Sequence, residues 1–306
     1  MAEFFFSRRL LGADGKFSWQ PSAKPTYAMI ERWLPNGSPA RILTSASWAR
    51  SVLASAKSNE VLIVVHGFNV MQNTFLGRIA KMRASLQASG FKGAVVGFDW
   101  PANGRSLDYK KDREDAKLTG PSLVWDGVDL LLKHNPGVKV HVLAHSMGCY
   151  ATSIALASAT GTVLEPKLKR SLKEVVFIGA DVDVEWTKPG AWAAESLRRC
   201  CGRFTSYGSI HDVPLQFSEN NGNPGTKRIG RAGLTHPASE TVVDVDGGDY
   251  YLNSYRFQHG WLLSHGWYFT DPVFRRDFLP VLAGQSPATQ TTRRRQADGH
   301  YQLVNA

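Results

Sequence analysis

Short apolar runs alternate along the chain with segments in which apolar residues recur every three or four positions. The first clear run covers residues 61–65, and similar runs occur in AVVGF, VHVLA and EVVFI. Runs of this kind are typical of strands that are covered on both faces, as in a parallel sheet. Between the first two runs, apolar residues lie at helical spacing at Phe75, Ile79, Met82 and Leu86. The pattern therefore predicts an α/β protein.

Strands and helices are predicted to alternate from about residue 60 onwards. The predicted strands cover 27–33, 41–43, 61–65, GAVVGFD, 139–144, EVVFI, 204–209 and 241–246. The predicted helices cover 45–57, 71–89, a segment through Leu123 and Leu132, 147–159, 191–200 and 272–282. Such alternation indicates a mostly parallel central sheet with helices on both faces.

Three parts of the chain differ in composition. Residues 1–26 lack strong periodicity and contain two prolines, so we predict a lead-in segment there. Residues 27–283 are predicted to form the α/β domain, in which 102–117 is a polar, charged loop. Residues 284–306 are rich in Gln, Thr and Arg, and we predict a disordered tail.

Length and charge narrow the class of protein. The chain has 306 residues, 43% of them hydrophobic, which is enough for one large domain. The net charge is +10, but the basic residues are spread along the chain, apart from Arg293–Arg295. Because no nucleic-acid-binding motif accompanies this charge, we expect no specific nucleic-acid partner. No apolar run approaches the length of a transmembrane segment.

Cysteine and acidic patterns do not indicate a metal site or a cofactor. The three cysteines are Cys149, Cys200 and Cys201. An odd count does not indicate a disulfide framework, and no further cysteine lies near the adjacent pair to complete a metal site. The acids of VDVDGGDYY do not have the spacing of a calcium loop. At the N-terminus three Phe residues precede Arg8, which is not the order of a secretory signal, so we expect a cytoplasmic protein.

One strand-to-helix junction carries candidate chemistry. The predicted strand 139–144 ends in Ala144-His145-Ser146-Met147-Gly148. This resembles the nucleophile elbow G-x-S-x-G, with alanine in place of the first glycine, and a small repacking would absorb the extra methyl group. The alternative is an ordinary N-cap serine. Since a buried strand leads into the turn, we favour Ser146 as a nucleophile.

A catalytic serine needs a base, an acid that orients the base, and donors for an oxyanion. In parallel sheets these groups collect beyond the carboxyl ends of strands. The candidate donors are the N–H of Met147 and one from the loop His66-Gly67-Phe68-Asn69, in which His66 is expected to be structural. Asp99 lies at a strand end and is followed by Trp100-Pro101, so we expect this segment to form a fixed wall of the substrate pocket rather than to take part in the reaction.

The acid and the base should follow the serine in chain order. Asp212 lies after a late predicted strand and is favoured over Asp181 and Asp183, which follow an earlier strand. His265 is expected on a loop between the last strand and the last helix. The other histidines after Asp212 are His236, His259 and His300, and His259 is the reserve candidate.

Six segments together resemble the alpha/beta-hydrolase superfamily, and more closely a bacterial alpha/beta-hydrolase family of unknown function. They are VVHGFNV, FDWPANG with Tyr109 and Asp112 downstream, LAHSMG, GADVD, YGSIHDVPL and SHGWYF, between about residues 60 and 275. The resemblance implies an alpha/beta-hydrolase fold and accommodates the alanine before His-Ser-Met-Gly. It implies a triad and two oxyanion donors at Ser146, Asp212, His265, Phe68 and Met147.

The expected function is that of a serine esterase that acts on small-molecule carboxylic esters through an acyl-enzyme, without a metal or a cofactor. An apolar acyl site is expected from Phe68, Trp100, Trp186, Trp192 and Trp267. A thioesterase or amidase with the same triad, and a noncatalytic binding protein of this fold, remain alternatives. The sequence leaves the acyl chain length, the oligomeric state and a mobile lid open.

Overall fold

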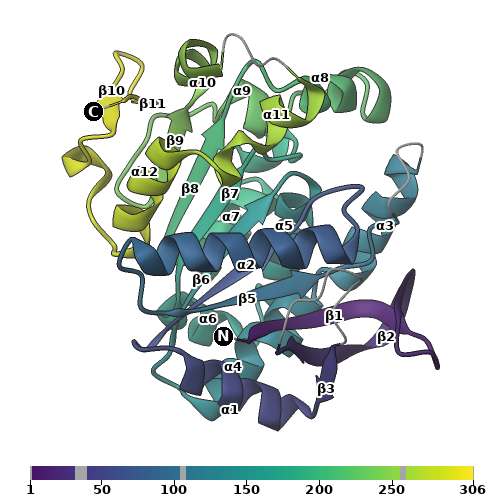
Figure 1. Ribbon diagram of the computed structural model, residues 1–306. Helices are drawn as coiled ribbons and strands as arrows, with labels where there is room; N and C mark the ends of the chain where they lie inside the picture. The colour runs from purple at the N-terminus through teal and green to yellow at the C-terminus, as the bar shows by residue number, and fades with distance from the viewer. Residues whose placement is uncertain (1, 32–39, 104–107, 256–259, 306) are drawn as a thin grey trace.

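One twisted sheet runs through the whole molecule (Figure 1). The computed structural model describes residues 2–31, 40–103, 108–255 and 260–305. In this part of the chain the sheet has eleven strands in the order β10-β11-β9-β8-β7-β6-β4-β5-β1-β2-β3. The central strands from β9 to β1 are parallel, and antiparallel pairs occur only toward the two edges.

The strands are β1 (Glu3–Leu11), β2 (Phe17–Ile30), β3 (Arg41–Leu43), β4 (Glu60–Val65), β5 (Ala94–Asp99), β6 (Lys139–His145), β7 (Leu172–Ile178), β8 (Arg203–Gly208), β9 (Val242–Asp246), β10 (Arg293–Arg295) and β11 (Tyr301–Leu303). The α-helices are α1 (Ser45–Ser55), α2 (Gln72–Ala88), α3 (Tyr109–Thr119), α4 (Asp129–His134), α5 (Met147–Ala159), α6 (Glu165–Ser171), α7 (Trp192–Cys200), α8 (Val213–Phe217), α9 (Ile229–Ala232), α10 (Gly248–Tyr255), α11 (Trp261–Gly266) and α12 (Pro272–Leu282). Other helical turns are η1 (Leu123–Val128), η2 (Val184–Thr187), η3 (Ser218–Gly222), η4 (Trp267–Phe269) and η5 (Pro287–Thr289).

Strand β4 shows why the central strands read as continuous apolar runs. Successive side chains of a strand point to opposite faces, and here both faces are covered. Val61, Ile63 and Val65 pack into the core on the side of α1, α4, α5, α6 and α7. Leu62 and Val64 pack into the second core, with α2 and α12. The predicted layers, helices on both faces of a mostly parallel sheet, are therefore confirmed (Figure 1).

The N-terminal segment is part of the sheet, and the prediction of a lead-in over 1–26 is wrong. Strand β1 lies between β5, with which it is parallel, and β2, with which it is antiparallel. Phe5 and Phe6 are fully buried, one in each core. The predicted strand 27–33 is the end of β2, which begins at Phe17, and residues 32 and 33 lie outside the described residues.

The C-terminal segment is also ordered, and the prediction of a disordered tail over 284–306 is wrong for residues 284–305. Strand β11 pairs in parallel with β9, and β10 pairs with β11. Arg293 of β10 is buried, and its guanidinium lies 2.7 Å from the carboxylate of Asp277 in α12. The buried ion pair explains how a polar segment is held against the domain.

The predicted polar loop 102–117 is wrong over its second half, because α3 begins at Tyr109. Residues 104–107 lie outside the described residues.

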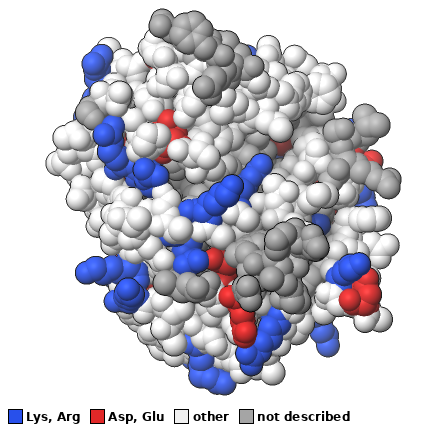
Figure 2. Space-filling model, in the orientation of Figure 1, with Lys and Arg blue, Asp and Glu red and all other residues white. Residues whose placement is uncertain are grey.

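On the face drawn in Figure 2, Lys and Arg side chains form several separate groups rather than one continuous stripe.

Candidate functional site

Ser146 occupies a strained turn at the carboxyl end of β6. It lies between the last residue of β6 and the first of α5, with φ 56° and ψ −128°. Such a left-handed conformation is rare for a residue with a side chain and persists only when its surroundings enforce it. A Cβ atom on Gly148 would lie 2.3 Å from the carbonyl oxygen of His66, so the close approach of α5 to this loop requires glycine. The elbow geometry predicted for this junction is therefore present.

Asp212 and His265 form a buried pair near the same edge of the sheet. Asp212 follows β8 and is fully buried. Its Oδ2 atom lies 2.6 Å from Nδ1 of His265, and its Oδ1 atom accepts the N–H of Leu215 at 2.9 Å, which caps α8. Burial raises the pKa of Asp212, while His265 and the Leu215 N–H act in the opposite direction. His265 lies at the end of the short helix α11, not on the loop that was expected.

Residues next to Ser146 connect it to this pair. His145 Nε2 lies 2.9 Å from the carbonyl oxygen of His265, and their rings are 4.4 Å apart. The N–H of Ser146 donates to Ile178 O at 3.1 Å. The following residue, Gly179, lies against the pair, because a Cβ there would be 3.1 Å from His265 Nδ1 and 3.2 Å from Asp212 Oδ2. The Ser146 turn and the Asp212–His265 pair are therefore connected through His145 and Gly179.

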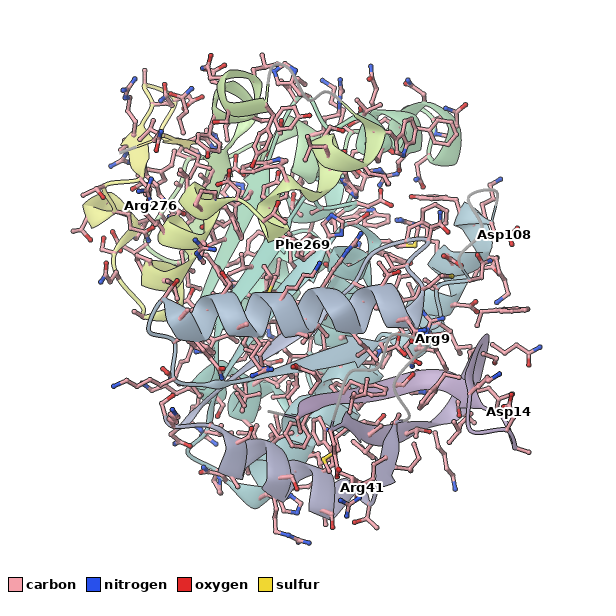
Figure 3. All side chains as sticks on the ribbon, viewed as in Figure 1. Arg9, Asp14, Arg41, Asp108, Phe269 and Arg276 are labelled. Atoms are coloured by element: carbon pink, nitrogen blue, oxygen red, sulfur yellow. The ribbon has the colours of Figure 1, made fainter. Side chains whose placement is uncertain are left out.

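The environment of His145 favours the neutral form of this histidine. Burial and the adjacent His265 hold the pKa of His145 well below its usual value. Phe269, labelled in Figure 3, places its ring 5.0 Å from that of His145. A neutral His145 can donate its Nε2–H to the His265 carbonyl and anchor the end of α11. Among the described residues, the Ser146 hydroxyl has no hydrogen-bond partner, and catalytic hydrogen bonds often tighten only when a substrate binds.

The competing acids have other structural roles. Asp183 caps η2, and its Oδ1 accepts the N–H of Glu185 at 2.9 Å. Asp181 accepts hydrogen bonds from Tyr109 Oη at 2.7 Å and Ser218 Oγ at 2.9 Å. Both carboxylates are therefore engaged by α3, η2 or η3 rather than by a histidine.

The competing histidines also differ from His265 in their surroundings. His300 Nδ1 lies 3.1 Å from Asp244 Oδ2, close to β11. The pKa of His236 is lowered by burial, which the charge of Asp244 opposes. His259 lies outside the described residues. Of the histidines considered as bases within the described ranges, His265 is the one that contacts Asp212.

The two predicted oxyanion donors lie on either side of the Ser146 turn. Met147 is the first residue of α5, where helix N–H groups lack intrahelical acceptors. Phe68 lies in the loop that follows β4. Within the described chain, no backbone hydrogen bond outside regular elements uses the N–H of either residue. Both groups thus remain available to an acceptor.

His66 has the structural role that was expected of it. Its Nδ1 lies 3.0 Å from Gly67 O, and its Nε2 lies 3.2 Å from Asp99 Oδ1. The indole N–H of Trp100 donates to His66 O at 2.7 Å. These contacts fix the start of the loop that carries Phe68.

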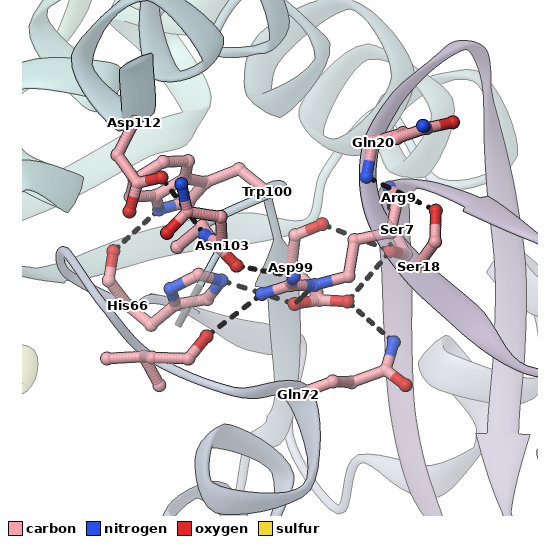
Figure 4. A network of polar contacts seen from close by, with 12 residues as sticks. Ser7, Arg9, Ser18, Gln20, His66, Gln72, Asp99, Trp100, Asn103 and Asp112 are labelled. Carbon is pink, nitrogen blue, oxygen red and sulfur yellow. Dashed lines mark hydrogen bonds and ion pairs between the residues drawn. The ribbon is translucent and has the colours of Figure 1, made fainter. Parts of the chain in front are cut away.

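Arg9 of β1 supports the same loop and was missed in the sequence (Figure 4). Its Nε donates to Asp99 Oδ1 at 2.8 Å, and its Nη2 donates to Val70 O at 2.9 Å. Its Nη1 donates to Ala102 O at 2.7 Å. Burial acts to raise the pKa of Asp99, but Arg9 and His66 outweigh it and lower that pKa. The sequence did not indicate this role of Arg9, because its hydrogen-bond partners are distant in the chain.

The expected aromatic acyl site is partly wrong. Trp100 and Trp267 are fully buried, so neither lines an open site. Trp186 and Trp192 are partly exposed, with their rings 5.4 Å apart, and Trp186 lies beside Tyr150 of α5.

No group of three or more His, Cys, Asp or Glu side chains in the described segments is arranged to hold a metal ion. The three cysteines are free and buried. None of the described helices combines the length and the apolar character needed to cross a membrane.

Several solved structures resemble this chain at low sequence identity. A predicted CIB-like hydrolase from Thermoplasma acidophilum is 13% identical with a TM-score of 0.41, and the match covers 92% of this chain and 97% of that one. A protein from Thermus thermophilus is 12% identical with a TM-score of 0.45, over 92% and 97%. Esterase B from Lactobacillus rhamnosis is 14% identical with a TM-score of 0.42, over 92% and 84%. At these values the likenesses do not bear on function.

Two matches rest on sequence. An uncharacterized protein from a Nostoc strain is 37% identical over 73 residues, which are 24% of this chain and only 19% of that relative. The family model described as alpha/beta hydrolase of unknown function (DUF900) matches residues 43–277. That match runs from α1 into α12 and contains every predicted site residue. The chain therefore belongs to this family of alpha/beta hydrolases and has the alpha/beta-hydrolase fold.

Proposed function

We propose that this protein is a serine hydrolase that cleaves carboxylic esters, with Ser146 as nucleophile, His265 as base and Asp212 as the acid that orients the base. The observation that carries the proposal is the 2.6 Å contact between His265 Nδ1 and Asp212 Oδ2 next to the strained Ser146 turn. With Nδ1–H directed to the carboxylate, Nε2 is left as the proton acceptor.

The first half of the reaction forms an acyl-enzyme. Ser146 Oγ attacks the ester carbonyl carbon while its proton passes to His265 Nε2. The buried carboxylate of Asp212 stabilises the resulting imidazolium. The C–O bond to the leaving alcohol then breaks, and His265 returns the proton to the departing oxygen.

The second half releases the acid. His265 takes a proton from a water molecule, which attacks the acyl carbon, and the bond to Ser146 Oγ breaks as the serine regains its proton. In both halves the carbonyl oxygen carries negative charge in the tetrahedral intermediate. The N–H groups of Phe68 and Met147 are the proposed donors to that oxygen, because oxyanion donors of this kind supply a large part of the rate enhancement.

Ester hydrolysis by Ser146→Ala tests the proposal. The substrate is a short-chain p-nitrophenyl ester, with thioester and anilide analogues measured alongside. The control is Ser153→Ala, since Ser153 is a buried serine of the same helix whose hydroxyl donates to Cys149 O. The proposal expects Ser146→Ala to lose all measurable hydrolysis and Ser153→Ala to keep it. Residual activity of Ser146→Ala within about tenfold of the parent would mean a different nucleophile.

A further inference from the structure

The first turn of α3 contacts the loop that carries Phe68 at two points. Asp112 is fully buried, its Oδ2 accepts the N–H of Asn69 at 3.3 Å, and its Oδ1 accepts the N–H of Asn103 at 3.0 Å. Tyr109 lies one turn before Asp112, and its ring packs edge-on against Phe68 with the centroids 5.6 Å apart. Figure 4 shows the Asp112 carboxylate at Asn103, beside His66 and Trp100.

Asn69 is the strained point of this loop. Its φ is 56°, in the left-handed region that non-glycine residues rarely occupy. The peptide plane that ends in the Asn69 N–H begins with the carbonyl of Phe68, so an acceptor on that N–H fixes the plane next to Phe68. A buried carboxylate is a strong acceptor for a backbone N–H. The Phe68 N–H belongs to the preceding peptide plane, which shares the Phe68 Cα atom, so fixing the following plane limits how far that N–H can turn away from the site.

The same turn of α3 also reaches the serine side of the site. Tyr109 Oη donates to Asp181 Oδ2 at 2.7 Å, and the Asp181 N–H donates to the carbonyl oxygen of Ser146 at 3.1 Å. Asp112 and Tyr109 thus connect the Phe68 loop and the Ser146 turn through one rigid helical turn.

We propose that Asp112 is a positioning residue that holds the Phe68 N–H in register with the Met147 N–H for the oxyanion. This inference rests on the proposed function, because it assigns Asp112 a role in the same reaction. Asp112 touches neither the nucleophile nor the base, and it acts through the backbone of Asn69.

The pKa of Asp112 indicates that this residue does not serve mainly to stabilise the fold. Burial raises the pKa of Asp112 from 3.8 to about 6, while the N–H groups of Asn103 and Asn69 oppose the rise. Asp115 on the same helix raises the pKa further, and Arg9 from β1 lowers it. A carboxyl whose folded-state pKa is raised contributes less to stability once it is ionised. That contribution is lost as the pH rises from about 4 to about 6. Ionised Asp112 therefore favours the loop contact at the expense of global stability.

The variant Asp112→Asn tests the positioning role, because it weakens the loop contact and also removes the buried charge. Asparagine keeps the size but presents one acceptor oxygen and an NH₂ group, so one of the two backbone N–H groups loses its acceptor and the other keeps only a neutral acceptor. At pH 8 the variant should have a kcat about 10- to 100-fold lower, with KM changed less than about threefold, because a misplaced oxyanion donor weakens transition-state binding. Its melting temperature should stay close to that of the parent, because the removal of a buried charge offsets the acceptor that one backbone N–H loses.

The matched control is Asp115→Asn. Asp115 is also a buried acid of α3, but it pairs with Lys111 and makes no hydrogen bond to the Phe68 loop among the described contacts. Its kcat should stay within about threefold of the parent. Asp112 has no positioning role if Asp112→Asn retains kcat to the same extent, or if its activity falls together with its melting temperature.

Amide hydrogen exchange of the peptide that contains residues 66–70 gives a readout that does not need activity. In Asp112→Asn this peptide should exchange roughly tenfold faster or more than in the parent at the same pH, because the hydrogen bond to a charged acceptor is gone. In Asp115→Asn it should not change. Unchanged exchange in Asp112→Asn overturns the positioning role. A parent protein that hydrolyses no ester contradicts the proposed function instead, and the two failures are thereby distinguished.

Discussion

Asp212 contacts His265 through one carboxylate oxygen while its other oxygen caps a helix. The Oδ2 atom lies 2.6 Å from His265 Nδ1, and the Oδ1 atom accepts the Leu215 N–H at 2.9 Å. The cap on α8 orients the carboxylate, and the carboxylate in turn orients the imidazole ring. Because Asp212 is fully buried, its carboxylate is not in contact with bulk solvent.

Asp212→Asn should lower turnover by several orders of magnitude. The substitution removes the charge that stabilises the imidazolium and favours the wrong tautomer of His265; in a well-studied triad this change lowers kcat about 10⁴-fold. The measurement is turnover of one activated ester, with a circular-dichroism spectrum to check folding. The control, Asp183→Asn, should lose roughly tenfold or less, since Asp183 caps η2 and an asparagine oxygen can still accept the Glu185 N–H. If Asp183→Asn loses most of its turnover and Asp212→Asn does not, the catalytic acid is Asp183, which follows β7, and the assignment of Asp212 is wrong.

Gly179→Ala should weaken the acid–base pair directly. Gly179 has φ +50°, and an added Cβ would lie 3.1 Å from His265 Nδ1 and 3.2 Å from Asp212 Oδ2. Alanine in this conformation destabilises the fold by about 1–2 kcal/mol, and the methyl group also pushes the pair apart. We expect kcat to fall tenfold or more, because small displacements of catalytic groups are costly.

Gly161→Ala separates the backbone effect from the contact. Gly161 has φ +77°, but an added Cβ there meets no atom within 4 Å. It lies beyond the end of α5 opposite Ser146, about 20 Å along the helix. Urea unfolding should show a loss of stability in both variants, larger in Gly179→Ala because its methyl group also meets the buried pair, whereas kcat should fall only in Gly179→Ala. Equal kcat values for the two variants would mean that the Asp212–His265 pair does not depend on the lack of a side chain at Gly179.

Arg293→Met should strongly destabilise the fold. Arg293 is the counterion of Asp277, which is fully buried and also accepts a hydrogen bond from Tyr207. Removing one partner of a buried ion pair typically costs about 3–5 kcal/mol. The neighbouring exposed Arg294 provides the control, and Arg294→Met should change the free energy of unfolding by less than about 0.5 kcal/mol. Equal urea midpoints for the two variants would mean that the C-terminal strands do not support the domain.

The central part of the fold could be predicted from the sequence because its signals are local. Strand β4 and helix α5 follow from an apolar run and from small and apolar residues within one segment. The edges of the sheet could not be predicted in this way. Strand β10 consists of three arginines, and its order depends on Asp277, sixteen residues earlier. Arg9 likewise meets Asp99 only after β1 has paired with β5.

The candidate triad residues could be proposed from the sequence, but the residues that hold them in place could not. Ser146, Asp212 and His265 each lie in a recognisable segment, in the chain order typical of the fold. Asp112 and Gly179 belong to two of the segments that carry the family resemblance, but they act through contacts with distant backbone or side chains, so the sequence did not indicate their roles. The helical position of His265 was missed because α11 is a single short helix without a clear period.

Labelling with a fluorophosphonate probe, followed by peptide mapping, tests the central claim most directly. The probe phosphonylates a serine only when a base activates it and donors receive the developing charge. We predict that the folded parent protein is labelled at Ser146, that Ser146→Ala is not labelled, and that Ser153→Ala is labelled like the parent. Folded parent protein that carries no label, or that carries it on another serine, would contradict the assignment of Ser146 as the nucleophile.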